Sequence, residues 1–168
     1  MKTSKKVISL GMIILLSTLI ISTTTTQAKK PARTEIINFE YKWDSHTDAK
    51  KEWTTNKGVL HTLQTPHFGT VQEGGDIAGT LYYCGNLILD TISFNGKGGG
   101  YFEFTGEYHG APAGFWGIMY FDIEALVLTG TLNLHGTGAF EGMLLKGTVY
   151  TILFVMPTTF VSLVVWNR

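Results

Sequence analysis

The feature that most constrains this fold is the regular interruption of short, β-prone runs by glycine. Of the 20 glycines, most lie between Gly69 and Gly147, spaced as turns and strand interiors rather than gathered into one linker. The runs between them are rich in Val, Thr, Ile and aromatic residues, and several alternate apolar and polar positions with the period of two that is typical of half-buried strands. Many short strands between glycine turns predict an all-β fold rather than an α/β fold.

The alternation is clearest in residues 35–43 and 101–109. Glycine inside such runs marks bulges, barrel corners or close approaches of two backbones. A small closed sheet needs these sharp bends, so the sequence predicts an antiparallel β-barrel of about eight strands, with a β-sandwich as the alternative. The apolar face of the first run consists of Ile37, Phe39, Tyr41 and Trp43.

Four segments need separate interpretation. The polar residues Thr47–Trp53 form either a helical turn or a surface loop, and Pro66 indicates an edge position or a break in its strand. The segment Gly96–Gly100 is interpreted as a hairpin turn, since it lacks the Gly-Lys-Ser/Thr ending of a phosphate-binding loop. The uncharged run Val149–Trp166 approaches the length of a membrane span, but its β-branched residues and its central Pro157 favour two strands.

The first 28 residues have the order of a secretory signal peptide. Lysines precede an apolar run, Val7–Ile21, and small residues follow it up to Ala28. We predict cleavage after Ala28, an exposed lead-in at residues 29–34 and a single domain at residues 35–168, with an uncleaved membrane anchor as the alternative. The protein is therefore expected to be secreted, with no membrane contact beyond the signal peptide. A lone cysteine, Cys84, cannot form an internal disulfide, which suits export from a prokaryotic cell.

The charge balance argues against nucleic-acid binding. Removing Lys2, Lys5 and Lys6 with the signal peptide leaves 10 of the 13 basic residues against 13 acidic ones, a net charge of −3. The remaining lysines form no basic patch or stripe, so no nucleic-acid partner is expected.

The reactive residues form no catalytic or metal-binding motif. The five histidines lack the local spacing of a zinc site, and neither a metal nor a cofactor is expected. There is no Gly-x-Ser-x-Gly element, and Cys84 lies in an apolar run without an adjacent base, which indicates a buried, inert thiol. Acidic residues such as Glu103 and Asp122 are interpreted as charges on the outer face rather than as a glycosidase pair.

Four glycine motifs follow one another in a recognisable order. They are Gly79–Leu81, Gly98–Gly106, Leu134–Gly142 and Lys146–Val149. This order resembles the allene oxide cyclase and dirigent barrel group and its uncharacterised prokaryotic relatives, over roughly the second half of the chain. The resemblance implies an antiparallel barrel of about eight strands with an apolar interior or cavity. In that group the fold serves cyclisation, stereochemical guidance of coupling and functions still unknown, so the fold alone assigns no activity.

Aromatic residues between positions 82 and 121 supply the candidates for a binding site. If the barrel encloses a pocket, some of them would line it together with a few polar groups, and if it does not, they form its core. The candidate ligand-binding residues are Tyr83, Tyr101, Glu103, His109, Trp116 and Tyr120.

The sequence therefore predicts a secreted β-barrel that binds a small apolar ligand, and it favours binding over catalysis. One alternative is a cyclase or isomerase of the resembling group, in which a cavity folds a reactive intermediate and a carboxylate or tyrosine, Glu103 first among them, steers it. The other alternative is a structural or surface-interaction protein with a filled barrel and an exposed apolar patch.

Overall fold

The computed structural model describes residues 35–71, 76–153 and 158–167, and within them the chain forms nine strands and no helix. The all-β prediction is confirmed. No helix that could span a bilayer occurs in this described part of the chain. The proposed signal peptide, its cleavage site and the lead-in lie outside it. The strands are β1 (Glu35–His46), β2 (Lys51–Thr54), β3 (Val59–Val71), β4 (Ile77–Asp90), β5 (Gly96–Tyr108), β6 (Ala111–Glu124), β7 (Val127–Gly138), β8 (Met143–Ile152) and β9 (Thr158–Asn167).

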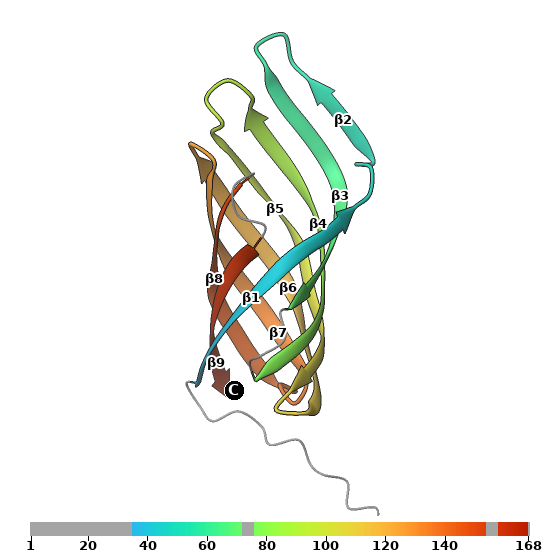
Figure 1. Ribbon diagram of the computed structural model, residues 1–168, viewed down its shortest axis with the longest axis vertical. Coiled ribbons are helices and arrows are strands. Elements are labelled where there is room, and N and C mark those ends of the chain that lie inside the picture. Colours follow the sequence, from blue (N-terminus) through green and yellow to red (C-terminus); the bar gives the residue numbers. More distant parts are fainter. Residues whose placement is uncertain (1–34, 72–75, 154–157, 168) are drawn as a thin grey trace, which may run out of the picture.

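All nine strands belong to one antiparallel sheet that closes on itself (Figure 1). The order is β1-β9-β8-β7-β6-β5-β4-β3-β2, and an additional pairing of β1 with β3 completes the ring. Eight strands thus form a barrel-like closed sheet, called the barrel below, and the short β2 is added along the outer part of β3. The single closed sheet matches the predicted barrel and not the β-sandwich alternative.

The two halves of the barrel interior differ. In the half that contains the β5–β6 turn, the lower half in Figure 1, aromatic rings fill the space. Phe104 and Phe115 stack with their ring centroids 4.8 Å apart, and Tyr108 lies 4.9 Å from Phe140. Each such side chain contributes about 2–3 kcal/mol when it is fully buried, so this half provides most of the aromatic core. The buried rings are Phe39, Phe102, Phe104, Tyr108, Phe115 and Phe140.

Strand β3 changes partners along its length. Its first part pairs with β2, and its last part, from His67 to Val71, pairs with β1. Between Thr62 and Thr65 a bulge shifts the register against β4, and Gln64 has a φ of 51° there. Pro66 follows the bulge at the change of partners, where its missing N–H group costs no ladder bond. Strand β3 continues through Pro66, so the predicted break does not occur, and the irregularity beside Pro66 is a bulge and a change of partners within one strand.

The segment Thr47–Trp53 contains no helical turn. Residues 47–50 have no regular structure, and residues 51–54 are β2, so the loop alternative was closer. Trp53 stacks on the ring of His61 across the β2–β3 pair, with centroids 4.7 Å apart and planes within 4°. This cross-strand contact, which involves residues outside the segment, favours the extended conformation over a helix.

The interpretation of Gly96–Gly100 as a hairpin turn was wrong, because these residues are the beginning of β5. The turn comes before them, where the Asp90 carboxylate accepts hydrogen bonds from the backbone N–H groups of Ile92 and Ser93. Instead, the glycines allow the backbone of β5 to lie close to neighbouring groups, because they have no side chain. A Cβ at Gly100 would overlap the Cys84 carbonyl oxygen on β4.

We expect Gly100→Ala to lower the free energy of unfolding by about 1–3 kcal/mol, since a rigid backbone neighbour occupies the place of the new methyl group. The matched control is Gly99→Ala, whose outward Cβ would meet the Tyr120 ring at 2.8 Å and the Met119 carbonyl oxygen at 2.9 Å. Tyr120 is 60% exposed and can move, so the loss should be smaller. Urea unfolding of both variants measures the difference, and equal losses would contradict the steric argument.

Candidate functional site

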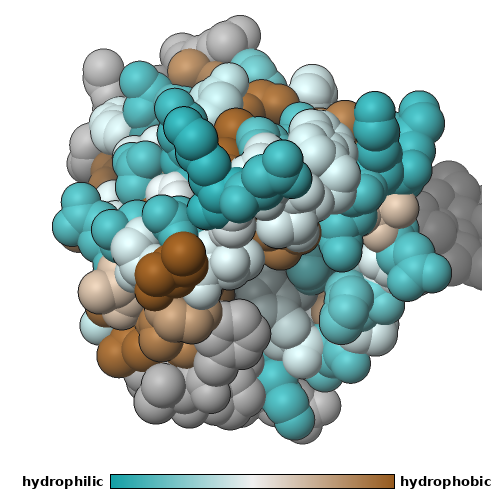
Figure 2. Space-filling model, turned by 90° about the horizontal axis from the view of Figure 1, so that it is seen from above, coloured by the Kyte–Doolittle hydropathy of each residue, from teal (hydrophilic) through white to brown (hydrophobic). Residues whose placement is uncertain are grey.

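The half of the barrel opposite the aromatic core contains a cavity of about 860 Å³. It is open to solvent at the end where β2 lies, and exposed residues of the β1–β2 segment, His46, Asp48 and Glu52, stand on its rim. Figure 2 looks onto this end, where the loops around the opening are largely hydrophilic. The interior walls come from β1, β3 and β4 on one side and from β6 to β9 on the other.

Glycines on β4 and β5 leave room for this cavity. Gly85 and Gly100 are paired across the two strands, and Gly85 lines the cavity. A Cβ at Gly85 would overlap the hydroxyl group of Tyr83, so this hydroxyl lies directly over the glycine. In the lower half the same strands carry Leu81 and Phe102 into the core. The exchange of large side chains for glycine along β4 and β5 therefore turns a filled interior into a hollow one.

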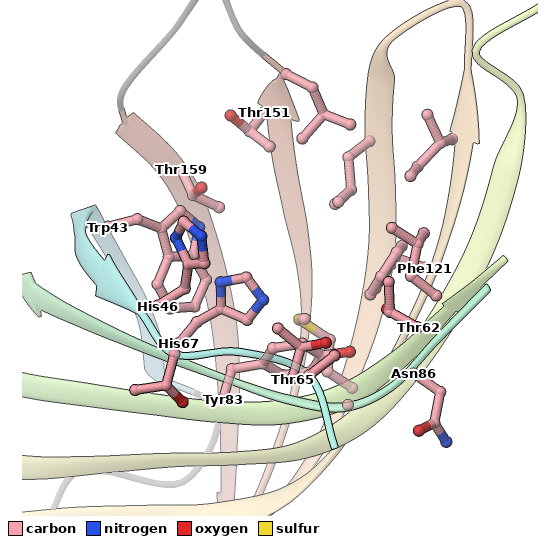
Figure 3. Close-up of a pocket in the computed structure, with 18 of the residues that line it drawn as sticks. Trp43, His46, Thr62, Thr65, His67, Tyr83, Asn86, Phe121, Thr151 and Thr159 are labelled. Atoms are coloured by element: carbon pink, nitrogen blue, oxygen red, sulfur yellow. The ribbon is translucent and has the colours of Figure 1, made fainter. Parts of the chain in front are cut away.

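One wall of the cavity is aromatic and carries polar groups. His67 on β3 lies 5.5 Å from the Trp43 ring and 5.8 Å from the Tyr83 ring, measured between centroids. His46 is opposite His67 in the β1–β3 pair, at 5.8 Å. Tyr41 packs edge-on against Trp43 at 4.7 Å. Figure 3 shows Trp43, His46, His67 and Tyr83 gathered on the same side of the cavity.

The opposite wall is mainly aliphatic, with one aromatic ring, that of Phe121, and with Thr151 and Thr159 adding hydroxyl groups. Thr151 is already satisfied, because its hydroxyl donates to the Thr158 carbonyl oxygen at 3.0 Å. Pockets for small organic molecules combine such an apolar lining with a small number of placed polar groups. The apolar residues of this wall are Met119, Phe121, Ile123, Leu128 and Leu153.

Two hydroxyl groups in the cavity lack hydrogen-bond partners among the described residues. They are the Oγ1 atom of Thr65 and the phenolic oxygen of Tyr83, and both atoms are buried. Thr65 is the cross-strand partner of Gly85, over which the Tyr83 hydroxyl lies, so the two groups are neighbours on one patch of wall. A buried polar atom without a hydrogen-bond partner lowers the stability of the fold by about 1–3 kcal/mol. A ligand that formed hydrogen bonds with these two hydroxyl groups would remove this cost.

Burial controls the protonation of the aromatic wall. It lowers the pKa of His67 below the ordinary value of 6.5, and the nearby His46 adds to this shift. Burial also raises the pKa of Tyr41 and Tyr83 above the ordinary 10.0. Near pH 7.5 this wall therefore presents a neutral imidazole and neutral phenols.

Of the six residues that the sequence proposed for the site, Tyr83 lines the cavity. Tyr101 and Glu103 are on the outer face of β5, where the Tyr101 hydroxyl donates to Glu103 Oε2 at 3.0 Å. Trp116 and Tyr120 are exposed on the outer face of β6. His109 follows β5 at the far end of the barrel, with Nδ1 3.2 Å from an Asp76 carboxylate oxygen. The structure therefore brings none of these five to the cavity.

Sequence reasoning missed Thr62, Thr65 and His67 as lining residues. A bulge between Thr62 and Thr65 lets both face inward, which strict alternation forbids. The only signal was Pro66, a residue typical of bulges. Trp43 was placed correctly on the inward face of its strand, although the sequence did not assign it to a site.

The described residues contain no group of three or more His, Cys, Asp or Glu side chains arranged to hold a metal ion. In the comparisons with known proteins, no family model and no curated protein matches this chain.

The lowered pKa of His67 predicts that stability falls as the pH is lowered. Between the pKa of folded His67 and the unfolded value near 6.5, the unfolded chain binds the proton more readily, so the free energy of unfolding decreases with falling pH. Urea unfolding between pH 7.5 and 5, in steps of about 0.5, should give a shallower slope for His67→Gln. His61→Gln, on the exterior beside Trp53, is the control and should retain the wild-type slope. A wild-type slope in His67→Gln would show that other groups cause the dependence.

Proposed function

We propose that this protein is an exported carrier or receptor that binds a small, largely apolar molecule in the upper half of its barrel. The observation that supports this most directly is the open cavity of about 860 Å³, which falls in the size range typical of pockets for small molecules. An unfilled interior is costly in a protein without a ligand, because the lining side chains lose van der Waals contacts. A ligand would restore these contacts.

The position of the cavity also supports binding. The lower half of the barrel holds the aromatic core, so an open upper half does not require the whole fold to be loosely packed. The proposed relationship to the allene oxide cyclase and dirigent barrel group is compatible with such an arrangement, since it implies a barrel with an apolar interior or cavity.

The two alternatives have less support. The cyclase or isomerase hypothesis needs a carboxylate or tyrosine in the cavity. Tyr83 lines the cavity, but Glu103 lies on the outer face of β5 and hydrogen-bonds to Tyr101 there. The structural hypothesis relied on a filled barrel, whereas the upper half contains the cavity. Binding without chemistry is therefore the function that we propose.

Binding of the neutral dye N-phenyl-1-naphthylamine tests this proposal. We expect saturable fluorescence enhancement at about one dye per chain, with quenching of Trp43 emission, because the Trp43 ring lines the cavity. Leu128→Trp should weaken binding about tenfold by filling the cavity. Thr129→Trp, next in the chain but exposed on the outside, is the matched control and should bind like the wild type. Absence of saturable binding by the folded wild type would refute the proposal.

Export is tested separately by the mature N-terminus. When the full chain is expressed in a bacterial host, mass spectrometry of the exported protein should find Lys29 as the first residue, in agreement with cleavage after Ala28. Full-length protein recovered only from the membrane fraction would favour the uncleaved anchor instead.

A further inference from the structure

The ligand class can be narrowed by the charges around the cavity, an inference that rests on the proposed binding function. We propose that the ligand is an uncharged amphipathic molecule whose polar end is a hydrogen-bond-accepting oxygen, such as a ketone or aldehyde carbonyl, held by the hydroxyl groups of Thr65 and Tyr83. Its hydrocarbon part would lie along the aliphatic wall formed by β6, β7 and β8.

The two unpartnered hydroxyls supply the positive argument. Tyr83 is only 6% exposed, and neither its hydroxyl nor that of Thr65 finds a partner among the described residues. Thr65 is paired with Gly85 across β3 and β4, and the Tyr83 hydroxyl lies over Gly85, so the two hydroxyls belong to one patch of wall. A carbonyl oxygen has two lone pairs and can accept from both donors at once. One ligand oxygen that accepts from both hydroxyls at this patch of wall would therefore satisfy both groups.

A carboxylate does not fit this site. Among the described residues that line the cavity there is no lysine or arginine. His67 offers no positive charge near pH 7.5, because burial lowers its pKa. The acidic groups among the lining residues, Asp48 and Glu52, cannot pair with an anion. Burying a carboxylate without a cationic partner is strongly unfavourable.

An alkylammonium fits poorly as well. The acidic residues of the lining, Asp48 and Glu52, are exposed on the rim, whereas Thr65 and Tyr83 are buried in the wall. A cation at the wall would have aromatic faces beside it but no carboxylate within the buried patch, and it would leave both hydroxyl protons without an acceptor. The charges of the lining residues and the two unpartnered hydroxyls therefore both favour a neutral ligand group that accepts hydrogen bonds.

Competition against bound N-phenyl-1-naphthylamine at pH 7.5 tests this inference with 2-undecanone, undecanoate and undecylammonium as probes. We expect 2-undecanone to displace the dye at a concentration about tenfold lower than either ion. Tyr83→Phe and Thr65→Val should each weaken 2-undecanone about fivefold, since each removes one hydrogen bond. The affinity of each variant for the dye is measured in parallel, so that a general loss of binding is separated from the loss of the hydrogen bond. Tyr82→Phe, which removes a neighbouring hydroxyl outside the cavity, is the matched control and should change neither affinity.

The outcomes separate the inference from the proposed function. If the dye does not bind, both fail. If the dye binds but undecanoate competes as well as 2-undecanone, or if both hydroxyl variants bind 2-undecanone like the wild type, the inference fails while the binding function stands. The second result would mean that water satisfies the two hydroxyls.

The wild type alone gives a further check. The carbonyl ¹³C resonance of labelled 2-undecanone should move downfield on binding, relative to its position in hexane, and an unchanged resonance would overturn the inference.

Discussion

The pairing of β1 with β3 is the contact on which the rest of the structure depends. It joins the first long strand to the strand that follows β2, and without it the sheet would be open, with two long edges. The pairing covers only the part of β1 from Tyr41 to His46. Toward its beginning, β3 pairs with β2 instead of β1, so β1 and β3 are not joined there. The barrel is therefore wider toward the β2 end (Figure 1). The closure of the sheet and the open end of the barrel thus both result from the change of partner along β3.

The distribution of large and small side chains divides the barrel into a stable part and a hollow part. Phenylalanines stack in the lower interior, whereas glycines on β4 and β5 carry no side chains into the upper interior. The interior of a barrel of about eight strands has room for either a packed core or one small ligand. In this chain the strands are long enough for a packed core in one half of the barrel and a cavity in the other. The two parts are contiguous, because Tyr41, Tyr83 and Phe121 belong to the buried core and also line the cavity.

The polar groups of the cavity come mainly from the seam between β1 and β3 and from the neighbouring β4. The bulge in β3 turns both Thr62 and Thr65 inward, and the Asn86 side chain holds it by accepting the backbone N–H of Gln64 at 2.9 Å. This bulge in the β3–β4 pair thereby places the Thr65 hydroxyl on the same patch of wall as Tyr83. Backbone irregularities next to functional sites are common for this reason, since they re-aim individual side chains.

The fold class follows from local information. Alternation in residues 35–43 placed Tyr41 correctly on the buried face, because the direction of a side chain in a regular strand depends only on its position in the strand. In residues 101–109 the alternation separated Phe102 from Tyr101 and Glu103, but it did not give which of the two faces is buried. The site does not follow in this way. Tyr101 and Glu103 looked like lining residues because aromatic and acidic groups often line pockets, but nothing in the sequence gives which face of β5 turns inward at the cavity end.

By itself, the sequence determined that this chain forms an all-β fold and favoured a barrel over a sandwich, since period-two patterns and glycine bends are local properties of the chain. Only the tertiary structure decided where the barrel is hollow. That depends on Gly85 meeting Gly100 across two strands, on Thr65 facing inward after a bulge, and on His67 meeting Trp43 across the closing seam. These are encounters between residues distant in the sequence, and the register that brings them together is fixed only when the ring closes.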